Sequence, residues 1–317
     1  MQSNRVLLSI LGWVIGFIIF FPILWMVMAS LKTEIEAVAT PPSFFFIPTL
    51  ENYFVVQSRS DYLNYAWNSI VISVFATLLA ILIAVPASYS FAFRPTKRTQ
   101  FKLVWILSTK MMPPVGVLIP MYLFYKNMGL LDTHLGLILI YTLINLPIVI
   151  WVLYTYFKDI PQEILEAAQM ECDGLLNIFL YILLPLSKSA IFSTSLLSIV
   201  LIWNESFWSL NLTAFEAAPL TTFISSYSSP EGLFWAKLSA ASTLAILPIM
   251  FLGWVTQKQM VKGQPEYGER ELDNKEFCKD RIVMLSRGRV SFAAKAKAAM
   301  EAQAAALIIV QTSDIWP

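Results

Sequence analysis

The sequence predicts an all-α membrane protein with six transmembrane helices. Of its 317 residues, 57% are hydrophobic and 14% are charged, and the mean hydropathy is +0.64. Because about a quarter of the residues of a soluble domain are charged, this composition requires lipid as the solvent. A bilayer core of roughly 30 Å takes about 20 helical residues to cross, and six apolar stretches are long enough. They lie near residues 6–31, 67–93, 103–126, 135–157, 187–210 and 237–257.

The charge balance and the content of cysteine and histidine exclude several classes of function. Lys and Arg number 22 and Asp and Glu 21, a formal net charge of +1, so we expect no surface for nucleic acid. Cys172 and Cys278 lie far apart, and His134 is the sole histidine. Disulfide scaffolds and Cys/His zinc sites are therefore excluded, and no metal site is expected.

The first apolar stretch predicts an anchored helix, because it is too long for a removable signal peptide and lacks a small-residue cleavage site. Loops rich in Lys and Arg resist translocation, so the loop 94–102, with four basic residues and no acid, is expected in the cytoplasm. The first loop, 32–66, has four acids against two basic residues and is expected outside. Both termini are then cytoplasmic.

The third stretch carries a charge and three helix breakers. Lys110 is followed by Pro113, Pro114 and Gly116. A charge within a span is costly and usually faces a cavity or a partner, and the backbone carbonyls of a broken helix line translocation paths in transporters. Lys110 is therefore a candidate for the substrate path. The alternative is that it pairs with a carboxylate for assembly or extends to the membrane interface. In the fourth stretch, Asn145 and Pro147 form a weaker candidate pair that otherwise only kinks and packs the helix.

The loop between the fourth and fifth stretches, 158–186, predicts a helix–turn–helix at the cytoplasmic surface. Pro161 suits the first turn of a helix, and Gln162 and Glu163, which follow it, favour the positive end of the helix dipole. Asp173-Gly174 supplies a turn before a second apolar helix, 175–184, which Pro185 interrupts. The small residues Ala167 and Ala168 would permit close approach by another protein. An ordinary amphipathic connector fits the same pattern.

In the fifth stretch, aromatic, amide and carboxylate side chains gather around Glu205. Aromatic faces beside such polar groups suit a sugar or sugar alcohol, whose C–H faces stack on rings and whose hydroxyls bond to acceptors. An aromatic belt at the membrane interface, or an outer gate, is the alternative. The candidates for the substrate path here are Trp203, Asn204 and Glu205.

The loop 158–186 resembles the EAA loop of the membrane subunits of bacterial ATP-binding-cassette importers. That motif is written EAA, three residues, Gly, nine residues and Ile-x-Leu-Pro. Glu166, Ala167 and Ala168 match its start, and Ile182, Leu184 and Pro185 match its end. Cys172 stands at the glycine position, and Gly174 follows two residues later, so either the turn has slid or docking is weakened. The resemblance extends over about residues 5–263 and is closest to the maltose-type carbohydrate permeases, particularly the sorbitol/mannitol type.

The resemblance implies a permease subunit of an importer in the bacterial inner membrane. Its partners would be a cytoplasmic ATPase dimer, a second permease, an extracytoplasmic solute-binding protein and a small carbohydrate. No GxxxxGK[ST] motif is present, so ATP would be bound by the partners, and this chain would have neither a cofactor nor an enzyme activity of its own. The ATPase-coupling residues implied are Glu166 as the electrostatic anchor, with Ala167, Ala168, Cys172, Gly174 and Pro185.

The segment 211–236 is expected to be an external loop. In maltose-type permeases the corresponding loop reaches the binding protein, and by that resemblance Ser225, Ser226, Tyr227 and Ser228 are candidates for this contact. A polar solvated loop is the alternative. After Gly263 the composition changes abruptly, and we divide the chain into a permease domain, 1–263, and a tail, 264–317. The tail predicts strand, helix, strand and resembles part of a protease-associated domain; a fusion or gene-model join after 263 accounts for it equally well.

Two other classes of function fit a hydrophobic chain. A stand-alone ion-coupled secondary transporter would use Lys110 and Glu205 as its coupling pair, but it has no need of an EAA loop. An intramembrane enzyme would need a nucleophile with a base, and neither a GxSxG elbow nor a His-containing metal motif is present.

Overall fold

In the computed structural model the chain is described over residues 2–160, 164, 168, 174, 177–229, 232–262, 282–286 and 306–310. It divides into two compact units. The first comprises 1–79, 111–145 and 199–248, and the second comprises 80–110, 146–198 and 249–317. Several long helices contribute one part to each unit, so the units interleave along the sequence.

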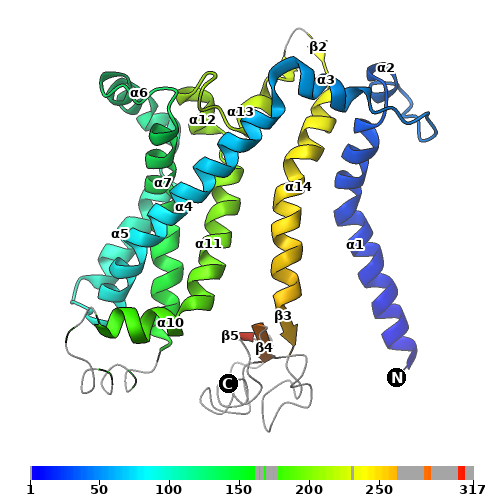
Figure 1. The fold of residues 1–317 in the computed structure, drawn as a ribbon. Helices are drawn as coiled ribbons and strands as arrows, with labels where there is room; N and C mark the ends of the chain where they lie inside the picture. The colour runs from blue at the N-terminus through cyan, green and yellow to red at the C-terminus, as the bar shows by residue number, and fades with distance from the viewer. Residues whose placement is uncertain are drawn as a thin grey trace. The chain divides into compact units, whose positions relative to one another are not determined.

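The described part is predominantly helical (Figure 1). Outside the membrane spans, short helices occupy the connections, and a small hairpin follows α13. In chain order the elements are α1 (Gln2–Ser30), α2 (Glu34–Ala37), α3 (Glu51–Ser60), α4 (Tyr62–Phe93), α5 (Thr99–Met111), η1 (Pro114–Val117), α6 (Leu118–Asn127), α7 (His134–Lys158), η2 (Ile178–Leu183), α10 (Leu184–Leu186), α11 (Lys188–Trp203), α12 (Phe207–Leu212), α13 (Leu220–Ser225), β1 (Ser228–Ser229), β2 (Gly232–Leu233), α14 (Trp235–Gln259), β3 (Met260–Lys262), β4 (Ile282–Ser286) and β5 (Ala306–Val310).

Four described helices are long and apolar enough to cross a membrane. They are Ser9–Ser30, Tyr62–Phe93, His134–Lys158 and Trp235–Trp254. Two further pairs of helices meet the same criteria together, but each is bent at a break, by 90° between α5 and η1–α6 and by 69° between η2–α10 and α11. The number of spans is therefore four to six, and the predicted six are reached only if each bent pair counts as one.

The break predicted in the third stretch is confirmed. Helix α5 ends at Met111, and a 3₁₀ turn starts at Pro114 before α6 begins. The two prolines lack backbone N–H groups, so the hydrogen bonds of a continuous helix cannot be made there.

The predicted fifth stretch, 187–210, is wrong in its C-terminal part, because α11 ends at Trp203. Glu205 lies between α11 and α12 and not within a span. Its carboxylate accepts the backbone N–H of Trp208 at 3.2 Å, which supplies a partner for a free N–H at the start of α12. The second helix of the preceding loop also differs from the prediction. It passes through Pro185 as η2 and α10, and the bend falls at Ser187.

Each unit has its own apolar core. In the second unit α4, α7 and the η2–α10 segment pack around Val85, Ile150, Leu153 and Phe157. In the first unit one cluster surrounds Tyr141, and another surrounds Phe223 and Tyr227. Polar side chains also join the helices, because Thr142 donates to the carbonyl of Ala76, and Ser88 donates to that of Ile150. Such bonds are typical of packed membrane helices.

The described strands of the C-terminal region form one parallel sheet in the order β3-β4-β5. Strand β4 covers the predicted first strand of the tail and β5 the second. The helix predicted between them lies outside the described residues. Strand β3 precedes Gly263, so the sheet includes residues from before the division that we drew at 263.

Candidate functional site

The predicted coupling loop is described at a few positions. Ile164 and Ala168 are helical, and Gly174 has a φ of +95°, a left-handed conformation that suits the predicted turn. Ala168 is 3% exposed and belongs to the core of the second unit, so its small side chain packs against this chain itself. Glu166, Ala167 and Cys172 lie outside the described residues.

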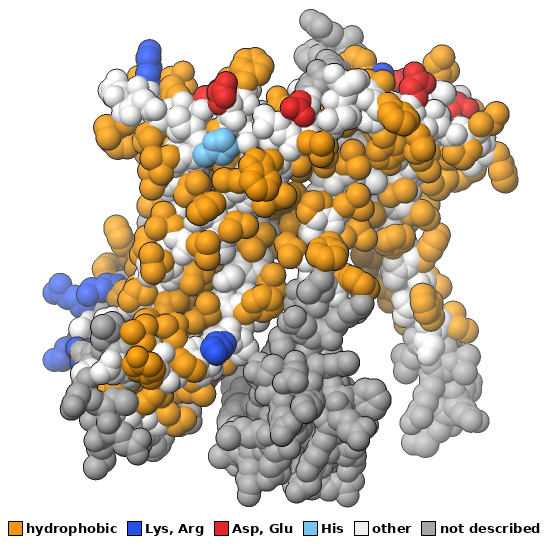
Figure 2. Space-filling model, viewed as in Figure 1, with side chains coloured by type: hydrophobic (Ala, Val, Ile, Leu, Met, Phe, Trp, Pro, Cys, Tyr) orange, Lys and Arg blue, Asp and Glu red, His pale blue; other side chains and the backbone are white. Residues whose placement is uncertain are grey.

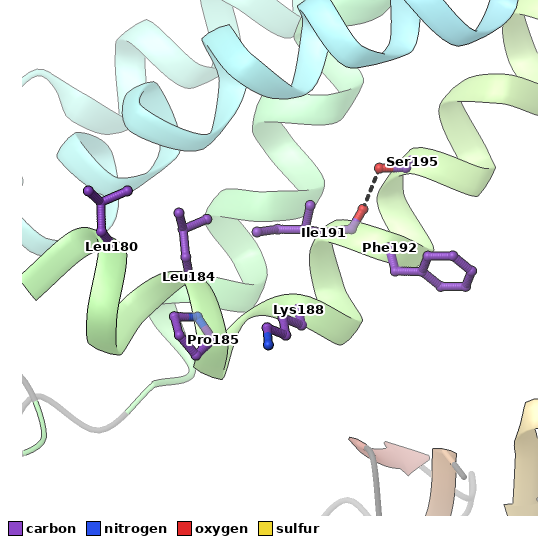
Figure 3. Close-up of a pocket in the computed structure, with 7 residues that line it drawn as sticks. All are labelled: Leu180, Leu184, Pro185, Lys188, Ile191, Phe192 and Ser195. Carbon is purple, nitrogen blue, oxygen red and sulfur yellow. Dashed lines mark hydrogen bonds between the residues drawn. The ribbon is translucent and has the colours of Figure 1, made fainter. Parts of the chain in front are cut away.

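An open groove of about 570 Å³ follows this loop, where η2 and α10 bend into α11. Figure 3 shows Pro185 and Lys188 side by side at the bend, and the hydroxyl of Ser195 turned to the carbonyl of Ile191, at 2.7 Å. The groove therefore offers an apolar surface with one cation, which suits an apolar segment that carries a negative charge. Its lining residues are Leu180, Leu184, Pro185, Lys188, Ile191, Phe192 and Ser195.

The predicted path residues belong to different units. Lys110 lies exposed near the end of α5 in the second unit. Asn145 is 1% exposed in α7 and belongs to the first unit. Lys110 thus lies next to the last residue of α5, close to the break before η1, as its sequence position predicted.

Trp203, Asn204 and Glu205 lie together in the first unit, and their polar atoms have local partners. The indole N–H of Trp203 donates to the carbonyl of Ala245 at 3.2 Å, and the amide of Asn204 donates to that of Val200 at 2.8 Å. The backbone oxygen of Glu205 accepts from the hydroxyls of Tyr141 and Thr221, at 3.2 and 3.0 Å. The backbone of Glu205 is therefore held firmly, while its half-buried carboxylate has further acceptor capacity.

The four candidates for contact with a binding protein differ in exposure. Ser226 and Ser228 are exposed, whereas Ser225 is half-buried and donates to the carbonyl of Thr221. Tyr227 is 1% exposed and its ring meets Phe223 edge-on at 5.3 Å. Tyr227 therefore stabilises the base of this segment, and the exposed surface comes from the two serines.

Sequence reasoning missed a carboxylate that clamps the segment between α12 and α13. Asp132, in the α6–α7 connection, accepts the backbone N–H groups of Ala214, Phe215, Glu216 and Ala217 at 3.0 to 3.2 Å. The residues lie more than 80 positions apart, and the local GLLDTH sequence indicates only a turn. The bonds hold Phe215, which is 75% exposed, on a fixed backbone.

The N-terminal end of α4 holds the same segment from another side. The amide of Asn68 donates to the carbonyls of Glu216 and Ala218, at 3.0 and 3.1 Å, and its oxygen is 2.8 Å from Nε2 of His134. The hydroxyl of Ser69 accepts the N–H of Leu220. The connection between α12 and α13 is therefore held in one backbone conformation by hydrogen bonds from distant residues, whereas its composition is also compatible with a polar solvated loop.

A second missed carboxylate fixes the start of α14. Glu34 accepts the N–H groups of Ala236 and Lys237 at 2.9 and 3.1 Å, and it lies 3.5 Å from the ammonium of Lys237. A carboxylate at a helix N-terminus satisfies free donors and favours the dipole. Residues 34 and 236 are thereby joined across 200 positions of sequence.

The family of the chain follows from a comparison of its sequence with known families. Residues 76–261, which run from within α4 to the end of α14 and include the whole loop 158–186, match the model of the binding-protein-dependent transport system inner membrane components. The chain belongs to this family. It is a multi-pass inner-membrane protein, and the expectation of an importer permease subunit is confirmed at the level of the family.

Curated relatives of this permease match along most of its length. It is 28% identical over 263 residues to the probable ABC transporter permease protein y4oR of Sinorhizobium fredii, covering 83% of this chain and 95% of the relative. It is also 28% identical over 264 residues to the trehalose/maltose transport system permease protein MalG of Thermococcus litoralis, covering 82% and 95%. A chain in the crystal structure of a bacterial ABC transporter involved in alginate import shares the fold, with a TM-score of 0.65 at 21% identity and coverage of 81% and 98%.

Loss of the Asp132 carboxylate is expected to release the segment 214–217 of this permease. Burial raises the pKa of Asp132, but the hydrogen bonds from the four backbone N–H groups lower it by more than burial raises it. The pKa of Asp132 therefore lies below its ordinary value of 3.8. The stabilisation by the four hydrogen bonds to the ionised carboxylate is therefore fully present above pH 3.8, and it is lost as the pH falls through the lowered pKa. For Asp132→Ala we expect the free energy that holds the segment 214–217 in place to fall by about 2 kcal/mol, since a hydrogen bond to a charged group contributes roughly that much to stability.

Hydrogen exchange of the amides at 214–217 would measure the effect of Asp132→Ala in purified protein. Asp132→Asn is the matched control, because asparagine tolerates the positive φ of 52° and retains one acceptor oxygen. Exchange at 214–217 should rise strongly in the alanine variant and less in the asparagine variant. Equal exchange in both variants and the wild type would contradict the clamp.

Proposed function

We propose that this chain is the membrane-spanning permease subunit of an ATP-driven importer of carbohydrates in the bacterial inner membrane. The observation that carries the proposal is the family match over 76–261, which includes the EAA-like loop. The carbohydrate class is supported by the relative from T. litoralis, whose name assigns it to trehalose/maltose transport. The partners proposed are a cytoplasmic ATPase dimer, a second permease and an extracytoplasmic solute-binding protein.

In this proposal the segment 161–175 carries the coupling helix and the turn that follows it. Glu166 is its electrostatic anchor, and the supporting positions are Ala167, Ala168, Cys172, Gly174 and, at the end of the motif, Pro185. Closure of the ATPases on ATP would move this segment and rock the helices between inward-open and outward-open states. The groove beside Pro185 and Lys188 supports the assignment, because it adjoins the coupling loop and presents an apolar surface with a cation.

We further propose that both termini face the cytoplasm. Near the ends of α4, α5 and α11 that are assigned to the cytoplasm lie Arg94, Lys97, Arg98, Lys102 and Lys188. The segments assigned to the outside hold Glu34, Glu36, Glu51, Asp132 and Glu216, together with Lys32, Lys126 and Lys237. Lys and Arg are retained on the cytoplasmic side. On this orientation the tail, 264–317, is cytoplasmic. The proposed transport mechanism gives it no role, although it resembles part of a protease-associated domain.

The function is tested by affinity purification of the full chain from its native membranes. We expect an ATPase and a second permease to co-purify, and uptake into proteoliposomes of that complex to require ATP and the binding protein. Recovery of the chain alone, with ATP-independent uptake driven by an ion gradient, would overturn the proposal in favour of a secondary transporter.

For the substrate we propose a sugar alcohol such as sorbitol or mannitol. Trp203, Asn204 and Glu205 combine an aromatic face, an exposed amide and a carboxylate on one short stretch. These are the groups that stack on C–H faces and bond to hydroxyls.

Glu205→Gln is expected to weaken polyol transport. The variant removes the charge but keeps one acceptor for the N–H of Trp208, and the bonds to the backbone oxygen remain. Loss of one charged bond to a hydroxyl predicts a KM for sorbitol raised roughly tenfold with little change in the maximal rate. Glu216→Gln, at an exposed carboxylate of the same unit, is the control. Unchanged kinetics in both variants would return Glu205 to a structural role.

A further inference from the structure

The loop between α2 and α3 contains four consecutive apolar residues, 44–47, whose side chains fall into two sets. Phe44 and Phe46 pack against other side chains of the first unit, as described below. Phe45 and Ile47 are 98% and 85% exposed. Figure 2 shows hydrophobic side chains gathered over this part of the chain, with acidic side chains along one side of it. Large apolar side chains so completely exposed beside a membrane span require a partner surface.

The backbone of this loop is fixed by a buried cation. Lys32 is 2% exposed, and its ammonium donates to the carbonyl of Ser43 at 2.5 Å. It also lies over the rings of Trp25 and Phe46, 4.8 and 4.9 Å from their centroids. A lysine at the end of a span usually extends its charge to water or to lipid phosphates. Here the aromatic rings cover the charge, so the loop presents no cation from Lys32 at its surface.

Two further contacts hold the ends of the loop. The backbone N–H of Thr49 donates to the carbonyl of Leu31 at 2.8 Å. The amide of Asn52, which is 4% exposed, donates to the carbonyls of Ser30 and Lys32, at 2.8 and 2.7 Å. The exposed side chains are thus carried on a backbone tied to the end of α1.

The contact between Phe44 and Trp25 fixes the depth of the loop. Their rings meet edge-on, with centroids 5.7 Å apart. Trp25 lies five residues inside the span that ends at Ser30, which at 1.5 Å per residue is about 7.5 Å below its end. The loop therefore folds back along α1 to the depth at which interfacial segments bury their apolar side chains.

We propose that Phe45 and Ile47, with the outer edge of Phe44, insert into the outer leaflet and anchor the first helix of the chain at a fixed depth. The occupant of this surface is the lipid at the boundary between headgroups and acyl chains. The exposed surface of Phe45 and Ile47 continues that of α1, because an 18-residue window of the α1 span has no residue buried within this chain. The proposal rests on the membrane location and not on the cargo, so it stands or falls independently of the importer's substrate.

The experiment measures the surroundings of spin labels on the full chain in nanodiscs of phosphatidylethanolamine and phosphatidylglycerol. Cysteines are introduced singly at Phe45 and Ile47 in a background with Cys172→Ser and Cys278→Ser. A label at Ile19, exposed within the α1 span, is the lipid control, and one at Glu51, exposed at the start of α3, is the water control. Collision of each label with oxygen, which concentrates in lipid, is compared with collision with a water-soluble nickel chelate.

Labels at 45 and 47 are expected to favour oxygen over the nickel chelate, as the label at 19 does, while the label at 51 shows the reverse. Preference for the nickel chelate at 45 and 47 would place the loop in water and overturn the proposal. Protection from both reagents would overturn it as well, because the surface would then be covered by another protein chain.

Discussion

Replacement of Glu166 by lysine is expected to abolish ATP-driven uptake while the chain still inserts in the membrane. Glu166 stands at the first position of the EAA-like motif, on the helix proposed to dock into the ATPase. If its carboxylate pairs with a cation of that partner, reversal of the charge replaces attraction with repulsion. Truncation of one partner of a close charge pair costs about 2–5 kcal/mol at an interface, which corresponds to roughly 30-fold to several thousand-fold weaker docking.

Two variants make the Glu166 experiment specific. Glu166→Gln removes the charge without reversing it and should give an intermediate loss. Asp159→Lys reverses an exposed charge just after α7, outside the proposed coupling helix, and should leave uptake close to that of the wild type. Uptake and recovery of the ATPase on purification are measured together. Normal uptake by Glu166→Lys, with normal expression, would remove this residue from coupling without affecting the membership of the family.

Gly136→Ala is expected to destabilise the first unit strongly. A Cβ at this position, in the first turn of α7, would run into the backbone carbonyl of Leu130 and crowd the hydroxyl of Thr133 and the ring of Tyr125. Gly136 itself donates to Thr133 and accepts from Tyr125, both at 3.0 Å, so the surrounding backbone cannot move without loss of those bonds.

The expected cost of Gly136→Ala is about 3 kcal/mol, the upper part of the range for overpacking a close contact. It would be measured as a lowered midpoint of thermal unfolding in detergent. Gly253→Ala is the matched control, because Gly253 is also helical, in α14, and has nothing within 4 Å of an added Cβ. Alanine favours a helix over glycine by up to 1 kcal/mol, so this variant should be neutral or slightly stabilised. Equal midpoints of thermal unfolding for the two variants would contradict the prediction, because the α6–α7 connection would then have moved to accommodate the methyl group without loss of stability.

Much of the organisation of this protein could be predicted from local sequence. Lengths of apolar stretches predict helices long enough to span a membrane, because every residue in such a stretch contributes independently to transfer into lipid. Pro113 and Pro114 predict the break after α5, because proline acts on its own backbone. The end of the fifth stretch was placed wrongly, since hydropathy continues through 203–210 while the carboxylate of Glu205 bonds to the backbone of Trp208 and starts a separate helix.

The sequence by itself thus determined the class of the protein, the number of apolar stretches and, through the EAA-like loop, the family. Only the tertiary structure decided which polar side chains hold the connections between the helices. Asp132 binds four backbone N–H groups more than 80 residues away, Glu34 fixes the start of α14 across 200 residues, and Lys32 lies in an aromatic enclosure. A charged residue near the end of a span looks the same in sequence whether it faces water or a backbone. The role of such a residue depends on which distant N–H donors and aromatic rings the fold brings within about 3 to 5 Å of its charge. Hydrogen bonds and cation–π contacts act only at that range.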